Sequence, residues 1–106
     1  MIIVNLTPHE LNICLRDGTQ VRTVAPSGMV ARLETEIIQV KVVDGIPFFA
    51  TNYLSSTNLP DRADDTIYVV SRLYFGSVYG RDDVFVPGES VRNGSGQVIG
   101  CVGLSV

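Results

Sequence analysis

The side chains best suited to chemistry lie between residues 66 and 92. This stretch holds three of the chain's eight basic residues and three of its four tyrosines. Arginine recognises phosphate or carboxylate through a planar pair of N–H groups, and tyrosine stacks on a base or ring with little loss of entropy. We therefore predict a site for a small nucleotide-like anion. Its members would be Ser71, Arg72, Tyr74, Tyr79, Arg81, Asp82 and Arg92.

Two other interpretations of the same residues stay open. Arg81 can pair with Asp82 or Asp83 at a turn, while the tyrosines are half buried in the core. Tyrosine and arginine are also enriched in protein–protein interfaces, so the stretch can instead meet another protein. Residues 71–79 fit a short helix capped by Ser71 better than a strand, and this choice decides which side chains share a face.

No nucleophile and base stand at a recognisable spacing elsewhere in the sequence. His9 is the only histidine, and we interpret it as a structural residue whose ring bonds the turn beside Pro8. The aspartates Asp61, Asp64 and Asp65 lack the ligand spacing of a calcium loop. We predict no catalytic residue, no metal and no cofactor, and a small hydrolase using His9 or the aspartates is the least favoured hypothesis.

The composition is typical of one folded, acidic domain spanning residues 1–106. The chain is 45% hydrophobic and 18% charged, which suits a globular protein. Its net charge of -3 argues against a nucleic-acid polymer as partner, because such a partner requires a basic face. No apolar run approaches a membrane span or signal peptide, so we expect no membrane contact and a cytoplasmic location. Cys14 and Cys101 match no metal or redox spacing and are expected to be buried free thiols.

Apolar runs with period two, or with continuous β-branched residues, predict strands through most of the chain. Asp17-Gly18, Asp44-Gly45 and the segment 93–96 predict hairpin turns, and Pro87-Gly88 predicts a further turn. The polar segment 51–65 predicts a surface loop. Strand-like runs occupy residues 2–4, 11–15, 21–25, 30–34, 37–43, 46–50, 67–70, 84–86, 90–92 and 97–104.

These elements predict a mostly-β fold. Counting adjoining runs together, we expect about seven or eight short strands and at most one or two short helices. Turn signals recur every few residues along the chain, which is typical of a small single-domain sandwich or partly open barrel. A domain of this size buries only about 60–70% of the surface that its unfolded chain exposes. Self-association would therefore supplement its stability, and we expect a homo-oligomer.

Several short segments form a recognisable series along the chain. They are Asn5-Leu6-Thr7-Pro8-His9, Pro26-Ser27-Gly28, Ala31-Arg32, Tyr68-Val69-Val70-Ser71, Arg81-Asp82-Asp83, Pro87-Gly88, Val91-Arg92 and Gly100-Cys101-Val102-Gly103-Leu104. In order and spacing they resemble a group of small proteins carried by bacteriophages and prophages. The likeness spans nearly the whole chain, but it carries no activity, cofactor or catalytic residue. It implies a phage accessory or virion-associated product that works inside a bacterium, in the host cytoplasm.

Two functions follow as hypotheses. The first is a non-catalytic phage-type binding protein that captures a small anionic nucleotide-like signal, or that blocks a host defence factor. The second is a structural or assembly protein of the virion, whose exposed strand edges pair with copies of itself or with a neighbour. Both hypotheses require a non-covalent partner and neither requires a cofactor.

Overall fold

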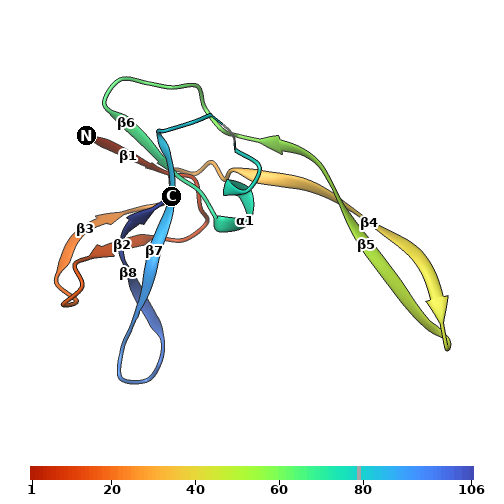
Figure 1. Cartoon of the computed structure of the whole chain (residues 1–106). Coiled ribbons are helices and arrows are strands. Elements are labelled where there is room, and N and C mark those ends of the chain that lie inside the picture. The colour runs from red at the N-terminus through yellow and green to blue at the C-terminus, as the bar shows by residue number, and fades with distance from the viewer. Residues whose placement is uncertain (79) are drawn as a thin grey trace.

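Six strands form one strongly curved sheet in the computed structural model, which describes every residue except 79 and leaves out the side chains of 53–57 (Figure 1). The strand order is β1-β6-β7-β8-β2-β3. The two edge strands meet, because Asn5 pairs with Pro26 and the Arg22 guanidinium donates to the Met1 carbonyl at 3.4 Å. The sheet is therefore a nearly closed barrel, which confirms the mostly-β prediction. Its strands are β1 (Ile2–Asn5), β2 (Leu11–Cys14), β3 (Gln20–Val24), β6 (Thr66–Val69), β7 (Val84–Arg92) and β8 (Val98–Ser105).

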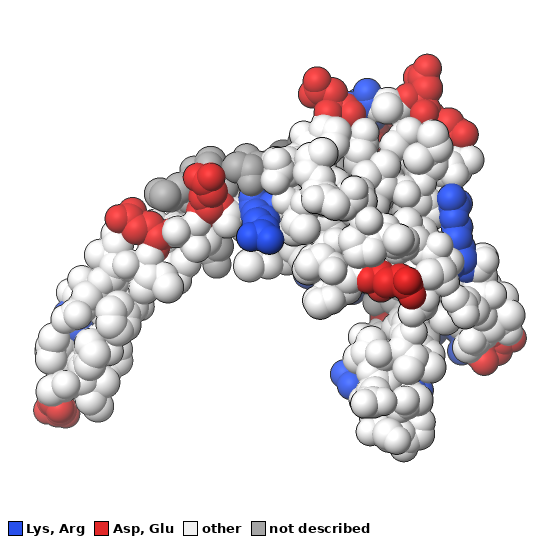
Figure 2. All heavy atoms as spheres, turned by 180° about the vertical axis from the view of Figure 1, so that it is seen from behind, with Lys and Arg blue, Asp and Glu red and all other residues white. Residues whose placement is uncertain are grey.

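The remaining two strands form a long hairpin, here called the arm, that leaves the barrel (Figures 1 and 2). β4 (Arg32–Val43) and β5 (Ile46–Thr57) pair antiparallel as a sheet of their own within the described chain. Asp44 and Gly45, with φ of 52° and 77°, form the predicted two-residue turn at the tip of the arm. Because of the arm, the radius of gyration is 17.1 Å, whereas a compact chain of 100 residues has about 13 Å.

The prediction of a surface loop over residues 51–65 is wrong for its first half. β5 continues to Thr57, which lies opposite Arg32 in the register of the arm. Strand pairing satisfies backbone N–H and C=O groups whatever the polarity of the side chains. The polar residues therefore extend the strand, and the irregular connection covers only residues 58–65.

The predicted turn at Pro87-Gly88 is also wrong, because both residues lie within the continuous strand β7. This strand pairs parallel to β6 only through Val84 and Phe85, and pairs antiparallel to β8 from Val86 onward. Beyond Phe85 one edge of β7 is thus open, and a proline without an N–H is tolerated there.

The segment after β6 forms the predicted helix, although a shorter one. α1 spans Arg72–Phe75, and the Ser71 hydroxyl accepts a hydrogen bond from the Tyr74 backbone N–H at 3.3 Å. Ser71 is thus the N-cap that the sequence predicts. The helix stops after one turn at Gly76, since glycine is a poor helix former.

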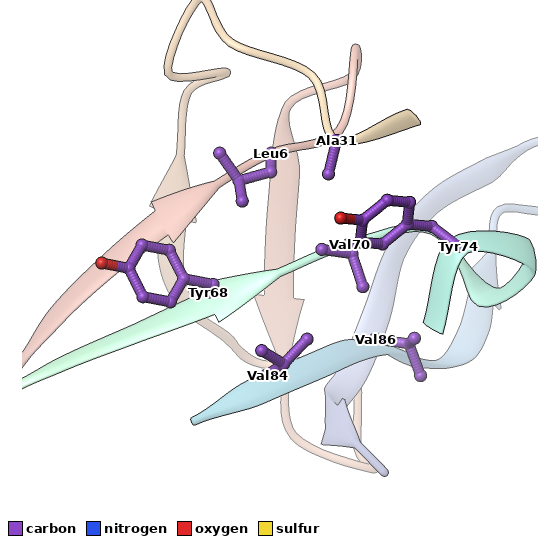
Figure 3. Close-up of a cluster of buried hydrophobic side chains, with 7 residues drawn as sticks. All are labelled: Leu6, Ala31, Tyr68, Val70, Tyr74, Val84 and Val86. Carbon is purple, nitrogen blue, oxygen red and sulfur yellow. The ribbon is translucent and has the colours of Figure 1, made fainter. Parts of the chain in front are cut away.

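The main cluster of buried apolar side chains lies between β6, β7, α1 and the segments at Leu6 and Ala31, and none of it lies beyond residue 31 in the arm (Figure 3). A second cluster lies on the other side of β6 and includes Val69 and Cys101. Cys14 and Cys101 are buried free thiols, as predicted, and burial raises the pKa of the Cys101 thiol. The main cluster consists of Leu6, Ala31, Tyr68, Val70, Tyr74, Val84 and Val86.

The Asn5 side chain joins three segments at the end of β1. Its amide nitrogen donates to the His9 carbonyl at 2.7 Å and to the Val24 carbonyl at 3.2 Å. Its amide oxygen accepts from the Thr7 backbone N–H at 2.9 Å and from the Thr7 hydroxyl at 2.7 Å. Asn5 is 1% exposed, so water cannot replace these bonds. One amide therefore fixes both the turn at 7–9 and the closure of the barrel at β3.

We expect Asn5→Ala to lower the free energy of unfolding by about 3 kcal/mol, because several buried polar groups lose their partners at once. Urea unfolding followed by circular dichroism measures this change. Asn12→Ala is the matched control, since its amide bonds the Ile99 carbonyl at 3.2 Å at an exposed position where water can substitute. Equal losses from the two variants would show that the Asn5 network does not hold the fold.

Candidate functional site

Among the residues that the structure describes, the predicted arginine and tyrosine side chains do not surround one hollow. Arg81 forms a two-pronged ion pair with Asp83, at 2.7 Å from Nε and 2.9 Å from a terminal nitrogen. The same terminal nitrogen donates to the Pro60 carbonyl at 3.0 Å, and the guanidinium lies 6.0 Å from the Tyr68 ring centroid. Arg81 is therefore engaged within the fold, as the alternative interpretation of the sequence had it.

Other members of the predicted set are also placed apart. Tyr74 is 2% exposed and belongs to the core. Asp82 pairs with Arg62 on the surface. Arg92 donates to the Gly96 carbonyl at 2.7 Å within the β7–β8 hairpin. Tyr79 lies outside the described residues. Among the described members of the predicted set, Ser71 and Arg72 border one groove, and Ser71 and Tyr74 line a second hollow of about 390 Å³.

Ser71 and Arg72 lie on a groove of about 770 Å³ on the side of the barrel. Four separate segments of the sequence form this groove. No local sequence motif could therefore have predicted it. Its walls combine apolar side chains with a few polar groups at the rim. The lining residues are Thr7, Pro8, His9, Glu10, Leu11, Asn12, Ser71, Arg72, Pro87, Gly88, Ser90, Val98, Ile99, Gly100 and Cys101.

Two glycines allow the strands behind the groove to approach closely. A Cβ atom on Gly100 would lie 2.6 Å from the Asn12 carbonyl oxygen, and one on Gly88 would run into the Val102 carbonyl oxygen. No other residue fits at either position without moving backbone. The glycines therefore fix the shape of the wall that β7 and β8 contribute.

The charged groups of the groove lie at its rim. One terminal nitrogen of Arg72 donates to the Pro87 carbonyl at 3.2 Å, which uses one of the five N–H donors of a guanidinium. His9 is exposed beside Glu10, and its backbone carbonyl, not its ring, receives the bonds that fix the turn. The prediction of a ring bonded to the turn is thus replaced by a carbonyl bonded to Asn5 and Thr7.

The outer part of the arm, residues 37–50, presents a second unusual surface, because most side chains on both of its faces are apolar. Residues opposite each other in an antiparallel pair share a face, and Val43 lies opposite Ile46 while Lys41 lies opposite Phe48. The Lys41 ammonium lies 5.5 Å from the Phe48 ring centroid, which agrees with this register. We call this side the first arm face.

The second arm face carries Phe49, Val42 and Ile37, since these residues alternate with those of the first face in the same register. Ile37 is 69% exposed and Phe49 is 59% exposed. Most of the visible arm surface in Figure 2 is uncharged. Contiguous exposed apolar surface of this kind marks interaction sites in soluble proteins. Sequence patterning located these strands but not their exposure.

Metal and membrane features are not found among the described residues. They include no group of three or more histidine, cysteine, aspartate or glutamate side chains that could hold a metal ion. In the same part of the chain, no helix has the length and apolar character needed to cross a membrane. Comparison with protein-family models, with curated proteins and with solved structures finds no match to this chain.

The Arg81–Asp83 pair makes a pH-dependent contribution to stability. The hydrogen bonds from Arg81 hold the pKa of the Asp83 carboxyl below its usual value. A carboxyl whose pKa is lowered by folding stabilises the protein above its unfolded pKa, and this stabilisation is lost as the pH falls through the folded value. The side chains are only 19% and 11% exposed, so solvent screens the pair weakly.

We expect Asp83→Asn to lower the free energy of unfolding by about 2 kcal/mol at pH 7, because a partly buried guanidinium loses its counter-charge. The difference from the natural protein should shrink below about pH 4, where the carboxyl begins to take up a proton. Urea unfolding between pH 2 and pH 7, roughly the range in which carboxyls titrate, measures both effects. Asp82→Asn, at the exposed neighbouring carboxyl, should cost less than about 1 kcal/mol. A pH-independent loss in Asp83→Asn would contradict the assignment.

Proposed function

We propose that this protein is a non-catalytic, self-associating protein whose arm binds further copies of the chain. The observation that carries the proposal is the arm, which is apolar on both faces and has no partner element in the described chain. Isolated two-stranded hairpins are marginally stable in water. Strands that are covered on both faces have nearly continuous apolar sequences. Between residues 37 and 50 the arm approaches this pattern, with Gln39, Lys41 and Asp44 as the polar side chains.

The exposed apolar surface of the arm is large enough for a specific interface. Standard interfaces bury about 800 Å² on each partner, and eight half-exposed aliphatic and aromatic side chains supply an area of that order. Charged residues are few among them, as at the centre of obligate interfaces. The eight residues are Ile37, Ile38, Val40, Val42, Val43, Ile46, Phe48 and Phe49.

The resemblance to bacteriophage-encoded proteins supports a structural or assembly role in the virion. Long arms that reach from one subunit to its neighbours suit such a role, because they tie subunits together without enlarging the core of each one. A host protein is the alternative occupant of the arm, in keeping with an accessory product that blocks a host factor. In both cases the proposal requires association and no chemical step.

We expect the natural protein to sediment as an oligomer, and Ile37→Lys with Phe49→Lys to shift it to monomer. The two charges would have to be buried on the second arm face, so the dissociation constant should rise at least about 100-fold. Sedimentation velocity over a range of concentrations measures this shift. Val21→Lys is the control, because Val21 is 60% exposed on β3 and lies outside the arm. A natural protein that remains monomeric at every concentration would overturn the proposal.

The groove favours a second candidate function, which is capture of a small anion. Its volume of about 770 Å³ falls in the range of pockets that hold small molecules. Arg72 supplies a cation at the rim, and Ser71 supplies a hydroxyl beside it. The predicted nucleotide-like ligand would then be held by Ser71 and Arg72, without the other members of the predicted set.

We expect a cyclic or linear nucleotide that binds the groove to raise the melting temperature. At 100 times its dissociation constant, a ligand that binds only the folded state adds about 2.7 kcal/mol to stability. Arg72→Ala should abolish the rise, whereas Arg81→Ala should melt earlier but keep the rise, because Arg81 lies in an internal ion pair. A thermal-shift screen measures all three proteins. An equal rise in Arg72→Ala would remove the groove as the site.

A further inference from the structure

We infer that the tip of the arm of one copy docks into the groove of a second copy, with Asp44 facing Arg72. This inference rests on the proposed self-association and names its contact. The tip comprises residues 42–49 and the groove is the one that Ser71 and Arg72 border. Each copy then gives one arm and receives one.

The tip has the composition of an inserted element. Val43 and Ile46 flank the turn and are 44% and 59% exposed, and Phe48 and Phe49 follow at 42% and 59%. Asp44 is the only charged residue between 42 and 49. Within the described chain, no hydrogen bond or ion pair engages its carboxylate. Figure 2 shows acidic atoms at the free end of the arm, surrounded by uncharged surface.

The groove complements the tip in polarity, because exposed apolar side chains line part of it. Leu11, Val98 and Ile99 line it, and the last two are 56% and 49% exposed although they are apolar. An arm that is apolar on both faces needs cover on both faces. A tip that inserts into a concave site is covered on more than one side, whereas packing two arms face to face would leave the outer faces in water.

The two surfaces carry opposite charges at Asp44 and Arg72, while Glu10 is a carboxylate that also lines the groove. Arg72 spends one N–H on the Pro87 carbonyl and keeps four donors. A carboxylate entering the groove can accept two of them as a bidentate pair. Between copies of an acidic protein of net charge -3, such a pair also opposes the general repulsion and selects the orientation of docking.

The contact is heterologous, because the tip and the groove are different surfaces of one chain. Heterologous contacts produce closed rings or open filaments, according to the rotation between successive copies. Figure 1 shows the tip at the far end of the arm from the barrel, so the chain cannot fill its own groove. The inference thus predicts an assembly in which every groove is filled by a neighbour.

A charge exchange tests the contact. Asp44→Lys alone and Arg72→Glu alone should each weaken association at least about tenfold, because like charges then meet at the tip. An equimolar mixture of the two variants should assemble again, since each arm finds an opposite charge in the other variant's groove. The double variant should also assemble by itself. Asp64→Lys makes the same charge change as Asp44→Lys at an exposed position outside both surfaces and should have no effect.

A cross-linking experiment keeps the inference testable where a charge variant folds poorly. Asp44→Cys and Val98→Cys, mixed in equal amounts and oxidised, should form a disulfide between the tip of one copy and the groove of the other. Val98 is 56% exposed, lines the groove and lies opposite Arg92 in the register of β7 and β8, whereas both natural cysteines are buried. A disulfide between two Asp44→Cys copies, without the mixed product, would overturn the inference in favour of arm-to-arm pairing.

The outcomes separate the inference from the proposed function. If Ile37→Lys with Phe49→Lys dissociates the oligomer while the charge exchange has no effect and the mixed disulfide does not form, the arm mediates association at another surface and only the inference fails. If the natural protein is monomeric, both fail. Restored assembly in the mixture of Asp44→Lys and Arg72→Glu supports both.

Discussion

The amide of Asn5 is the interaction on which the geometry of this fold depends. It is the point where the end of β1, the turn at 7–9 and the end of β3 are joined by hydrogen bonds that water cannot reach. The same bonds that close the barrel therefore set one wall of the groove, because Thr7 and His9 belong to both. A buried amide with four hydrogen bonds tightly restricts the positions of the segments that it joins. Any shift of these segments leaves polar groups unpaired, at a cost of about 1–3 kcal/mol each.

The chain divides its apolar residues between two tasks. Those of the barrel are buried by the chain itself, with Val69 and Val70 at 0% exposure. Those of the outer arm are exposed on both faces. Because they remain in contact with water, the hydrophobic effect contributes little to the stability of the hairpin. The backbone ladder of β4 and β5 and the turn at Asp44-Gly45 form the arm. Under the proposed function, a partner would supply the burial, and the arm would be the part that associates.

Local chemistry made much of the fold predictable. The hairpin tip was predictable because a tight two-residue turn requires positive φ at both positions, and Asp44-Gly45 suits that conformation. The start of the helix was predictable because the Ser71 hydroxyl can accept a hydrogen bond from a backbone N–H of the first turn. The extension of β5 was not predictable from its polar residues, because it is set by the length of its partner β4. Nor does an apolar run indicate whether its own chain or another chain covers it.

The candidate site was harder to predict than the fold, for a related reason. Arg81 is adjacent in sequence to the residues that suggested a ligand, but Asp83, two positions away, is a closer partner than any external anion. The groove draws on segments near residues 10, 72, 88 and 100, and no local pattern links them. Only Arg72 belongs both to the predicted set and to the charged rim of the groove.

Arg72 is also the point at which the two candidate functions meet. A small anion in the groove and the Asp44 carboxylate of a neighbouring arm would use the same guanidinium donors, so they compete for one site. Such competition is reciprocal, because a ligand that weakens arm docking must itself bind more weakly to the assembled protein, and by the same factor. Capture of an anion and self-assembly are then linked as opposing states of one groove. An anion would release arms, and assembly would exclude anions.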